Sequence, residues 1–132
     1  MPSIFTKIIN GEIPCFKVAE TSDYLAFLDI RPLTKGHTLV IPKKEVDYIF
    51  DLDQTEFAGL HLFSKIVAEG IKKAIPCLRV GVCVMGLEVP HAHIHLIPFS
   101  NLEEMNFANP KLVFTNEEMA KTANEIAIQL PK

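Results

Sequence analysis

Three histidines spaced two residues apart, His91, His93 and His95, are the part of this sequence best suited to chemistry. Successive side chains of a β-strand point to opposite faces, so the three imidazoles are expected on one face and the apolar residues between them on the other. Three histidines in register are hard to explain as an ordinary polar strand face. Two kinds of chemistry can use such a row.

The first is metal binding. Two rings that are two residues apart lie about 6.6 Å apart along a strand, which is close enough for both to reach one ion. His91 and His95 lie about 13 Å apart, too far for all three to hold one ion, so a metal would need another ligand such as His37 or Glu88. A metal-dependent hydrolase that uses two of the three histidines is therefore one hypothesis.

The second is nucleophilic catalysis on phosphorus. A neutral imidazole attacks phosphorus, holds the group as a phosphoramidate and releases it to water, which divides one difficult step into two. Its other ring nitrogen then needs an acceptor, and the phosphate and leaving-group oxygens need donors. The flanking histidines and the backbone N–H groups that follow Gly86 are candidates for these tasks.

The strands that would carry these residues are predicted from alternation, β-branched residues and turn signals. They occupy residues 16–19, 24–30, 37–41, 78–85 and 91–99.

Helices are predicted from apolar spacing and capping signals. Residues 3–9 indicate a short opening helix. A long helix begins at the capping residue Asp53 and ends before Pro76, and a C-terminal helix runs from Thr115 to about Leu130. Because helices and strands do not alternate strictly, we expect an α+β fold with a five-stranded, largely antiparallel sheet, a long central helix and a C-terminal helix.

Composition narrows the classes of partner. With 132 residues the chain can bury one core without a disulfide or metal, and 13 Lys and Arg against 16 Asp and Glu disfavour an extended nucleic acid. The three cysteines form no C-x-x-C pair, which indicates a reducing cytoplasm. No signal-like segment or apolar run of about 18 residues predicts export or a membrane span. The mean hydropathy of +0.22 predicts that a partner covers some apolar surface.

The motif H-x-H-x-H and several blocks around it resemble the histidine triad (HIT) superfamily of nucleotide hydrolases and transferases. The similarity is to its nucleotide-binding (HINT-like) branch, of the bacterial type with a C-terminal helical extension. The matching blocks are IFTKIINGEIP at 4–14, AFLDI at 26–30, GHTLVIPK at 36–43 and MNF at 105–107. The resemblance implies a HIT-like fold, with a HIT domain over 1–108 and a helical extension over 109–132 that packs on the same domain.

The resemblance also implies a role for each histidine. His93 corresponds to the nucleophile that takes a nucleoside monophosphate, and His95 would contact phosphate or leaving-group oxygens. The carbonyl of His91 would orient the His93 ring, and His37 would lie beneath the site in the histidine network. From the residues alone, His37 is equally an ordinary buried histidine.

Nucleotide-binding residues are implied in the same way. Asp29 corresponds to the acidic residue that binds the ribose hydroxyls, although before Arg31 and Pro32 it also fits a turn. The implied base-pocket residues, which would be core residues in most folds, are Phe5, Ile8, Phe27 and Ile30.

The block before the triad departs from the family pattern. Gly86 is retained, but Leu87 stands where a Gln is usual, Glu88 stands where a hydroxyl residue is usual, and the usual Asn is absent. Gly86, Leu87 and Glu88 all remain nucleotide-binding candidates. A carboxylate 4 Å from a phosphate is repulsive by roughly 1–4 kcal/mol. We therefore expect Glu88 to face a cationic leaving group or to bridge through an ion, the alternative being a solvated turn residue.

The leading hypothesis is a nucleotide-binding hydrolase or transferase. It would cleave a nucleoside monophosphate such as AMP from an amine, acyl or phosphate group through a nucleotidyl-histidine intermediate. It requires no metal or other cofactor, although a divalent cation is compatible with Glu88. The alternatives are a purine nucleotide-binding regulatory protein with weak catalysis and a dinucleoside polyphosphate hydrolase. The family's edge-to-edge sheet pairing implies a homodimer.

Overall fold

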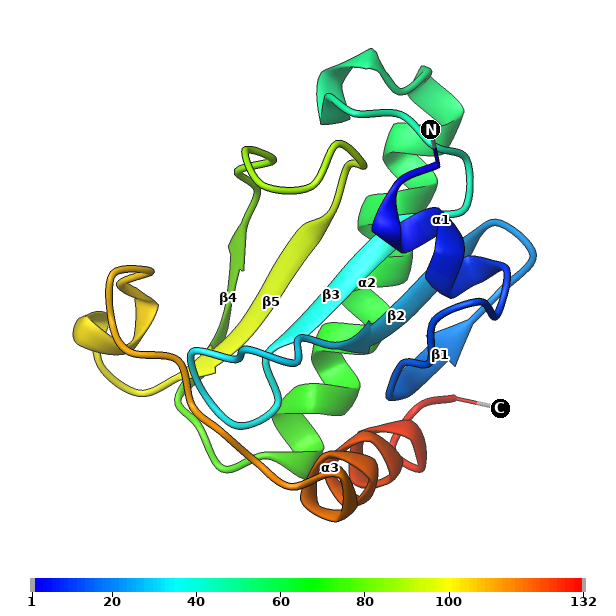
Figure 1. Ribbon diagram of the computed structural model, residues 1–132. Helices are drawn as coiled ribbons and strands as arrows, with labels where there is room; N and C mark the ends of the chain where they lie inside the picture. Colours follow the sequence, from blue (N-terminus) through cyan, green and yellow to red (C-terminus); the bar gives the residue numbers. More distant parts are fainter. Residues whose placement is uncertain (1, 132) are drawn as a thin grey trace.

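A five-stranded antiparallel sheet organises the computed structural model, which describes residues 2–131 (Figure 1). Its strands lie in the order β1-β2-β3-β5-β4, and each neighbouring pair is antiparallel. The expected α+β class and largely antiparallel sheet are confirmed. The strand bounds are β1 Lys17–Glu20, β2 Tyr24–Leu28, β3 Thr38–Pro42, β4 Arg79–Cys83 and β5 Ile94–Phe99.

Three α-helices and two 3₁₀ turns complete the described chain. Their bounds are α1 Ile4–Ile9, η1 Ile49–Asp51, α2 Gln54–Ala74, η2 Leu102–Met105 and α3 Asn116–Ala127. In Figure 1 the long helix α2 crosses behind the sheet, α1 lies in front of it, and α3 lies near the end of α2. None of the helices within residues 2–131 is long and apolar enough to cross a membrane.

The sheet separates two apolar clusters. The larger lies between the sheet and α2 with α3, and alternate strand residues such as Leu28, Val40 and Ile94 face it. Residues of α3 belong to this cluster as well: Met119, Ala123 and Ile126. The smaller cluster lies on the opposite face and is made by Phe5, Leu25, Phe27, Leu39 and Ile41. The sheet therefore has a core face under α2 and a second face under α1.

Strand β5 begins three residues later than the alternation predicts. The register pairs Val40 with Ile94, which places Pro42 opposite Ala92. Proline has no N–H, so the ladder cannot continue there, and the Ala92 N–H instead donates to the Val46 carbonyl at 2.7 Å. His91 and His93 thus precede the ladder, and His95 alone of the three lies within it.

Other boundaries differ by a few residues. β2 ends at Leu28 rather than at residue 30, and β4 covers 79–83 rather than 78–85. The last helix ends at Ala127, and the chain continues to Leu130 in tighter turns, with Gln129 N donating to Ile126 O and Leu130 N to Ala127 O. These are the frayed ends at which local periodicity is least informative.

Candidate functional site

His93 is held by the backbone of its own segment. Its Nδ1 lies 2.7 Å from the carbonyl oxygen of His91. A carbonyl only accepts, so Nδ1 carries the hydrogen and Nε2 of the neutral ring carries the lone pair. The ring is 6% exposed and meets the Phe5 ring edge-on, with centroids 5.0 Å apart. The arrangement fixes the orientation and the tautomer of the His93 ring.

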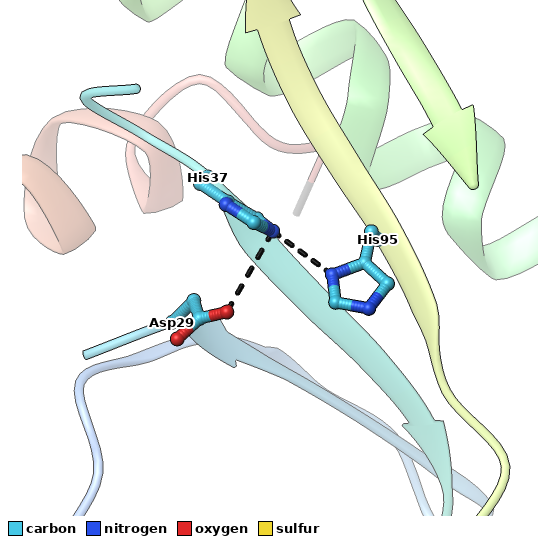
Figure 2. A group of neighbouring side chains, drawn as sticks. All are labelled: Asp29, His37 and His95. Carbon is cyan, nitrogen blue, oxygen red and sulfur yellow. Dashed lines mark hydrogen bonds and ion pairs between the residues drawn. The ribbon is translucent and has the colours of Figure 1, made fainter. Parts of the chain in front are cut away.

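His37 and His95 belong to a second chain of hydrogen bonds, and Figure 2 draws the bond between their two rings. The Leu33 N–H donates to His37 Nδ1 at 3.0 Å, so the proton of the neutral His37 ring is on Nε2. His37 Nε2 lies 2.9 Å from His95 Nδ1, which must therefore be the acceptor. The proton of His95 is then on Nε2. His95 thus offers a donor beside His93, whose ring centroid lies 5.0 Å from its own.

Burial keeps these rings neutral. It lowers the pKa of His37 to about 3 and the pKa of His95 to about 4, and neighbouring imidazoles lower both pKa values further. Burial also lowers the pKa of His91. At neutral pH these three rings therefore present lone pairs and N–H donors rather than imidazolium charges.

Asp29 lies at the edge of the histidine group. Burial raises the pKa of its carboxyl, while the Arg31 N–H donates to Oδ1 at 2.9 Å and acts in the opposite direction. Its Oδ2 is 3.7 Å from His37 Nε2. Gly36, which precedes His37, has a φ of +92° that suits glycine, and a Cβ there would lie 2.9 Å from the Ile75 side chain.

Asp29, His37 and His95 are also the residues in the described chain with the spacing of a metal site, since their ligand atoms lie within 4.8 Å of one another (Figure 2). A metal on His37 Nε2 would displace the proton there to Nδ1. At Nδ1 that proton would oppose the Leu33 N–H. The donor set thus fits a hydrogen-bonded relay, and we assign no metal to it.

His91 is buried completely, and its hydrogen-bond partners lie outside this relay. Its Nε2 lies 2.8 Å from the Pro42 carbonyl and therefore carries the proton, and its Nδ1 lies 2.8 Å from the Ser3 hydroxyl. Ser3 is the N-cap of α1 and accepts from the Thr6 N–H. His91 thus links α1 to the end of β3.

The predicted nucleotide-binding residues divide into two groups. Phe5 and Phe27 pack edge-to-face at 5.5 Å next to His93, with Ile8 against the same cluster. The other predicted residues lie toward solvent: Ile30 is 71% exposed, Leu87 is 93% exposed and Glu88 is also exposed. Gly86 has φ +75°, which suits a glycine at the turn before them.

Sequence reasoning missed several residues of the site. Phe107 places its ring edge-on to His95 and His37, at 5.1 and 6.3 Å. The MNF block contained Phe107 but gave it no role. The charge of Lys111 lowers the pKa values of both Asp29 and His37, and its Nζ donates to the Phe107 and Asn109 carbonyls. No side-chain pattern in the sequence indicates that the Leu33 N–H donates a hydrogen bond to His37.

Comparisons with known proteins agree with this geometry. Residues 10–102, more than half of the chain, match the family described as HIT domain. The chain is 36% identical to adenosine 5'-monophosphoramidase hnt1 of Schizosaccharomyces pombe, covering 98% of this chain and 99% of that protein. It is 38% identical to adenosine 5'-monophosphoramidase HNT1 of Saccharomyces cerevisiae, covering 72% of this chain and 61% of that protein.

Solved structures give the same result. A HIT-like protein from Bartonella henselae superimposes with a TM-score of 0.84 and 31% identity, covering 97% of this chain and 96% of that one. A histidine triad nucleotide-binding protein from Sulfolobus tokodaii superimposes with a TM-score of 0.82 and 29% identity, covering 96% and 90%. The fold and the histidine site define a histidine triad protein. The chain belongs to the HIT domain family, and the resemblance seen in its motifs is confirmed.

Proposed function

We propose that this protein is a nucleotide hydrolase that releases a nucleoside monophosphate, with AMP as the model product, from a phosphoramidate. The observation that carries the proposal is the fixed tautomer of His93, whose Nδ1–H points to the His91 carbonyl. Two relatives named adenosine 5'-monophosphoramidase support the substrate class.

In the first step, the lone pair of His93 Nε2 attacks phosphorus, and the bond from phosphorus to the leaving nitrogen breaks. The positive charge that develops on the ring is stabilised through Nδ1–H by the His91 carbonyl. His95 Nε2–H donates a hydrogen bond to a phosphate oxygen or to the leaving nitrogen, and the leaving nitrogen departs as an amine with a proton taken from solvent.

In the second step, water attacks phosphorus, the bond to His93 Nε2 breaks, and the water gives up one proton to solvent, which balances the proton taken up by the amine. The nucleoside monophosphate is released and the neutral ring is restored. His37 keeps the proton of His95 on Nε2 through both steps, because its own proton is directed to His95 Nδ1. The base would lie against Phe5 and Phe27, and the ribose hydroxyls would bind Asp29.

The test is release of AMP from an adenosine phosphoramidate. His93→Ala should reduce turnover by at least about a thousandfold, since the nucleophile itself is lost, whereas His61→Ala, on the exposed face of α2, should retain it. Mass spectrometry of the intact protein during turnover should detect an AMP adduct. Activity in a chelator should equal activity without it.

Full activity of His93→Ala would refute the proposal, and AMP binding without turnover of any phosphoramidate would favour a regulatory nucleotide-binding protein.

We also propose that the protein is a homodimer. β4 pairs only with β5 among the described strands, so its other edge has free backbone N–H and C=O groups. Apolar residues line this edge: Val82 is 61% exposed, Val84 38% and Met85 48%. A second copy paired edge to edge would satisfy the backbone groups and cover the apolar residues.

Light scattering tests this second proposal. The protein should have twice the monomer mass at micromolar concentration, and Val82→Lys should shift it toward the monomer by placing like charges at the interface. Val113→Lys is the matched control, because Val113 is 93% exposed on the segment before α3. A monomeric mass for the unsubstituted protein would refute the dimer.

A further inference from the structure

Glu45, an exposed residue three positions after the end of β3, accepts two hydrogen bonds from the start of the chain. Its Oε1 lies 2.7 Å from the Ser3 backbone nitrogen and 2.6 Å from the Thr6 hydroxyl. These two donors lower the pKa of its carboxyl, so it is ionised at neutral pH and both hydrogen bonds are charge-assisted.

The shortest contacts of this network assign its remaining protons, in preference to the longer contacts of the Thr6 hydroxyl with Ser3 at 3.3 Å and with His91 at 3.5 Å. His91 Nε2 must donate to the Pro42 carbonyl, so its Nδ1 needs a donor. The Ser3 hydroxyl, 2.8 Å away, supplies it, while its oxygen accepts the Thr6 N–H at 3.0 Å. The Thr6 hydroxyl is used by Glu45. These donors and acceptors are thus matched across three segments of chain: Ser3 to Thr6, Pro42 to Glu45, and His91.

The network fixes two parts of the chain that contact His93. One is α1, which has six residues and is too short to be stable without tertiary contacts. It carries Phe5, whose ring lies 5.0 Å from His93 and 5.7 Å from His91. The other is the carbonyl of His91, which accepts from His93 Nδ1.

We propose that Ser3, Thr6 and Glu45 are positioning residues that, with His91, form an α1 clasp. The clasp keeps two groups in position next to His93: the ring of Phe5, against which the base would lie, and the carbonyl of His91, which orients the His93 ring. Glu45 acts from the surface without contacting the substrate. The proposal rests on the proposed function for its catalytic consequence, whereas the docking of α1 is independent of it.

The experiment compares Glu45→Ala and Ser3→Ala with two conservative variants. Glu45→Gln keeps an oxygen acceptor for both donors, and Ser3→Thr keeps the hydroxyl. Asp47→Ala is the matched control, because Asp47 is an exposed carboxylate on the same loop. Amide hydrogen exchange of α1, AMP affinity by calorimetry, and kcat and KM for an adenosine phosphoramidate are measured for each.

We expect Glu45→Ala and Ser3→Ala to accelerate exchange at the α1 amides while leaving the α2 amides unchanged. AMP affinity should fall about fivefold to tenfold, which corresponds to roughly 1–1.4 kcal/mol, and kcat should also fall. Glu45→Gln, Ser3→Thr and Asp47→Ala should stay near the unsubstituted protein. Restored affinity in Glu45→Gln would distinguish positioning from a general loss of stability.

Unchanged exchange of α1 and unchanged affinity in Glu45→Ala would overturn the clasp. An equal effect of Asp47→Ala would overturn it too, because any carboxylate of the loop would then serve. If the unsubstituted protein neither binds AMP nor cleaves the phosphoramidate, the proposed function fails, and exchange at α1 still decides whether the clasp exists.

Discussion

At the level of single residues, hydrogen-bond partners determine which nitrogen of each imidazole carries hydrogen. The low pKa values of His37 and His95 mean that neither ring adds a positive charge beside His93 at neutral pH. The proposed attack on phosphorus places positive charge on the His93 ring, so a neutral neighbour favours it. Burial of His37 and His95 therefore favours the chemistry, in addition to its effect on stability.

Glu88 is the residue whose charge fits a phosphate site least well. It is exposed, and its carboxylate raises the pKa of Asp29, so the two negative groups act on each other. We expect these two negative charges to favour a leaving amine that bears a positive charge.

Glu88→Gln should therefore lower kcat/KM for a cationic amine relative to a neutral amine about fivefold, the effect of roughly 1 kcal/mol for one charge pair in water. Adenosine phosphoramidates of the two amines are compared with both proteins, and Glu117→Gln on α3 is the control. Faster turnover of both substrates with no change in amine preference would show that Glu88 only repels phosphate.

At the level of elements, α3 is part of the main core. Its residue Ile126 is fully buried and belongs to the same cluster as Leu60 and Val67 of α2. Close packing continues at Gly70, where a Cβ would lie 2.4 Å from the Leu130 side chain. Helix α3 therefore packs on the same core as α2, and the family match ends before it, at residue 102.

Ile126→Ala should destabilise the whole protein. Removing buried methyl and methylene groups leaves a cavity, and the free energy of unfolding should fall by about 2–5 kcal/mol. Ile128 lies two residues further along the chain and is 63% exposed, so Ile128→Ala should change the free energy of unfolding by less than about 0.5 kcal/mol. Urea unfolding measures both. Equal, small effects would mean that α3 is an appendage whose loss the core tolerates.

The elements were largely predictable because their signals are local. Thr115 and Glu118 form the capping box that their spacing predicts, and Asp53 caps α2 by accepting the Glu56 N–H. The start of β5 was not predictable in this way. Alternation over residues 91–99 is regular, but the ladder stops where Pro42 of a distant strand lies opposite, and that depends on register.

The candidate site could be read from the sequence only where chemistry needs a particular side chain, as at His93 and Asp29, whose roles stay predictions. It was not predictable where the partner is a backbone group or an ordinary surface residue. Leu33 acts through its N–H, and Glu45 resembles any exposed carboxylate of a loop. Only the folded chain brings these groups to the histidines.

At the level of the whole molecule, the buried histidines make stability depend on pH. An unfolded histidine has a pKa near 6.5, whereas folded His37 and His95 have pKa values of about 3 and about 4. Between these values the unfolded chain binds more protons, so the free energy of unfolding falls as the pH is lowered below about 6.5.

The expected loss is roughly 2 kcal/mol for each of these histidines between pH 7 and pH 5, from the linkage of proton binding to unfolding. Urea unfolding at several pH values measures it. His37→Asn should show a shallower dependence, and His61→Asn, with an exposed ring, should keep the dependence of the unsubstituted protein. The same slope in all three proteins would mean that His37 is not held neutral by the fold.

The relay has a consequence for how the residues of this site can be found. Three main-chain groups determine which nitrogen of each imidazole carries hydrogen: Leu33 N–H, the Pro42 carbonyl and the His91 carbonyl. An alanine scan keeps all three, so it would score Leu33 and Pro42 as packing residues. Exchanging Leu33 for proline would delete the N–H and release the tautomer of His37, and with it the donor that His95 offers. Part of the site's chemistry thus depends on the positions of main-chain N–H and C=O groups. A comparison of side chains cannot detect this part.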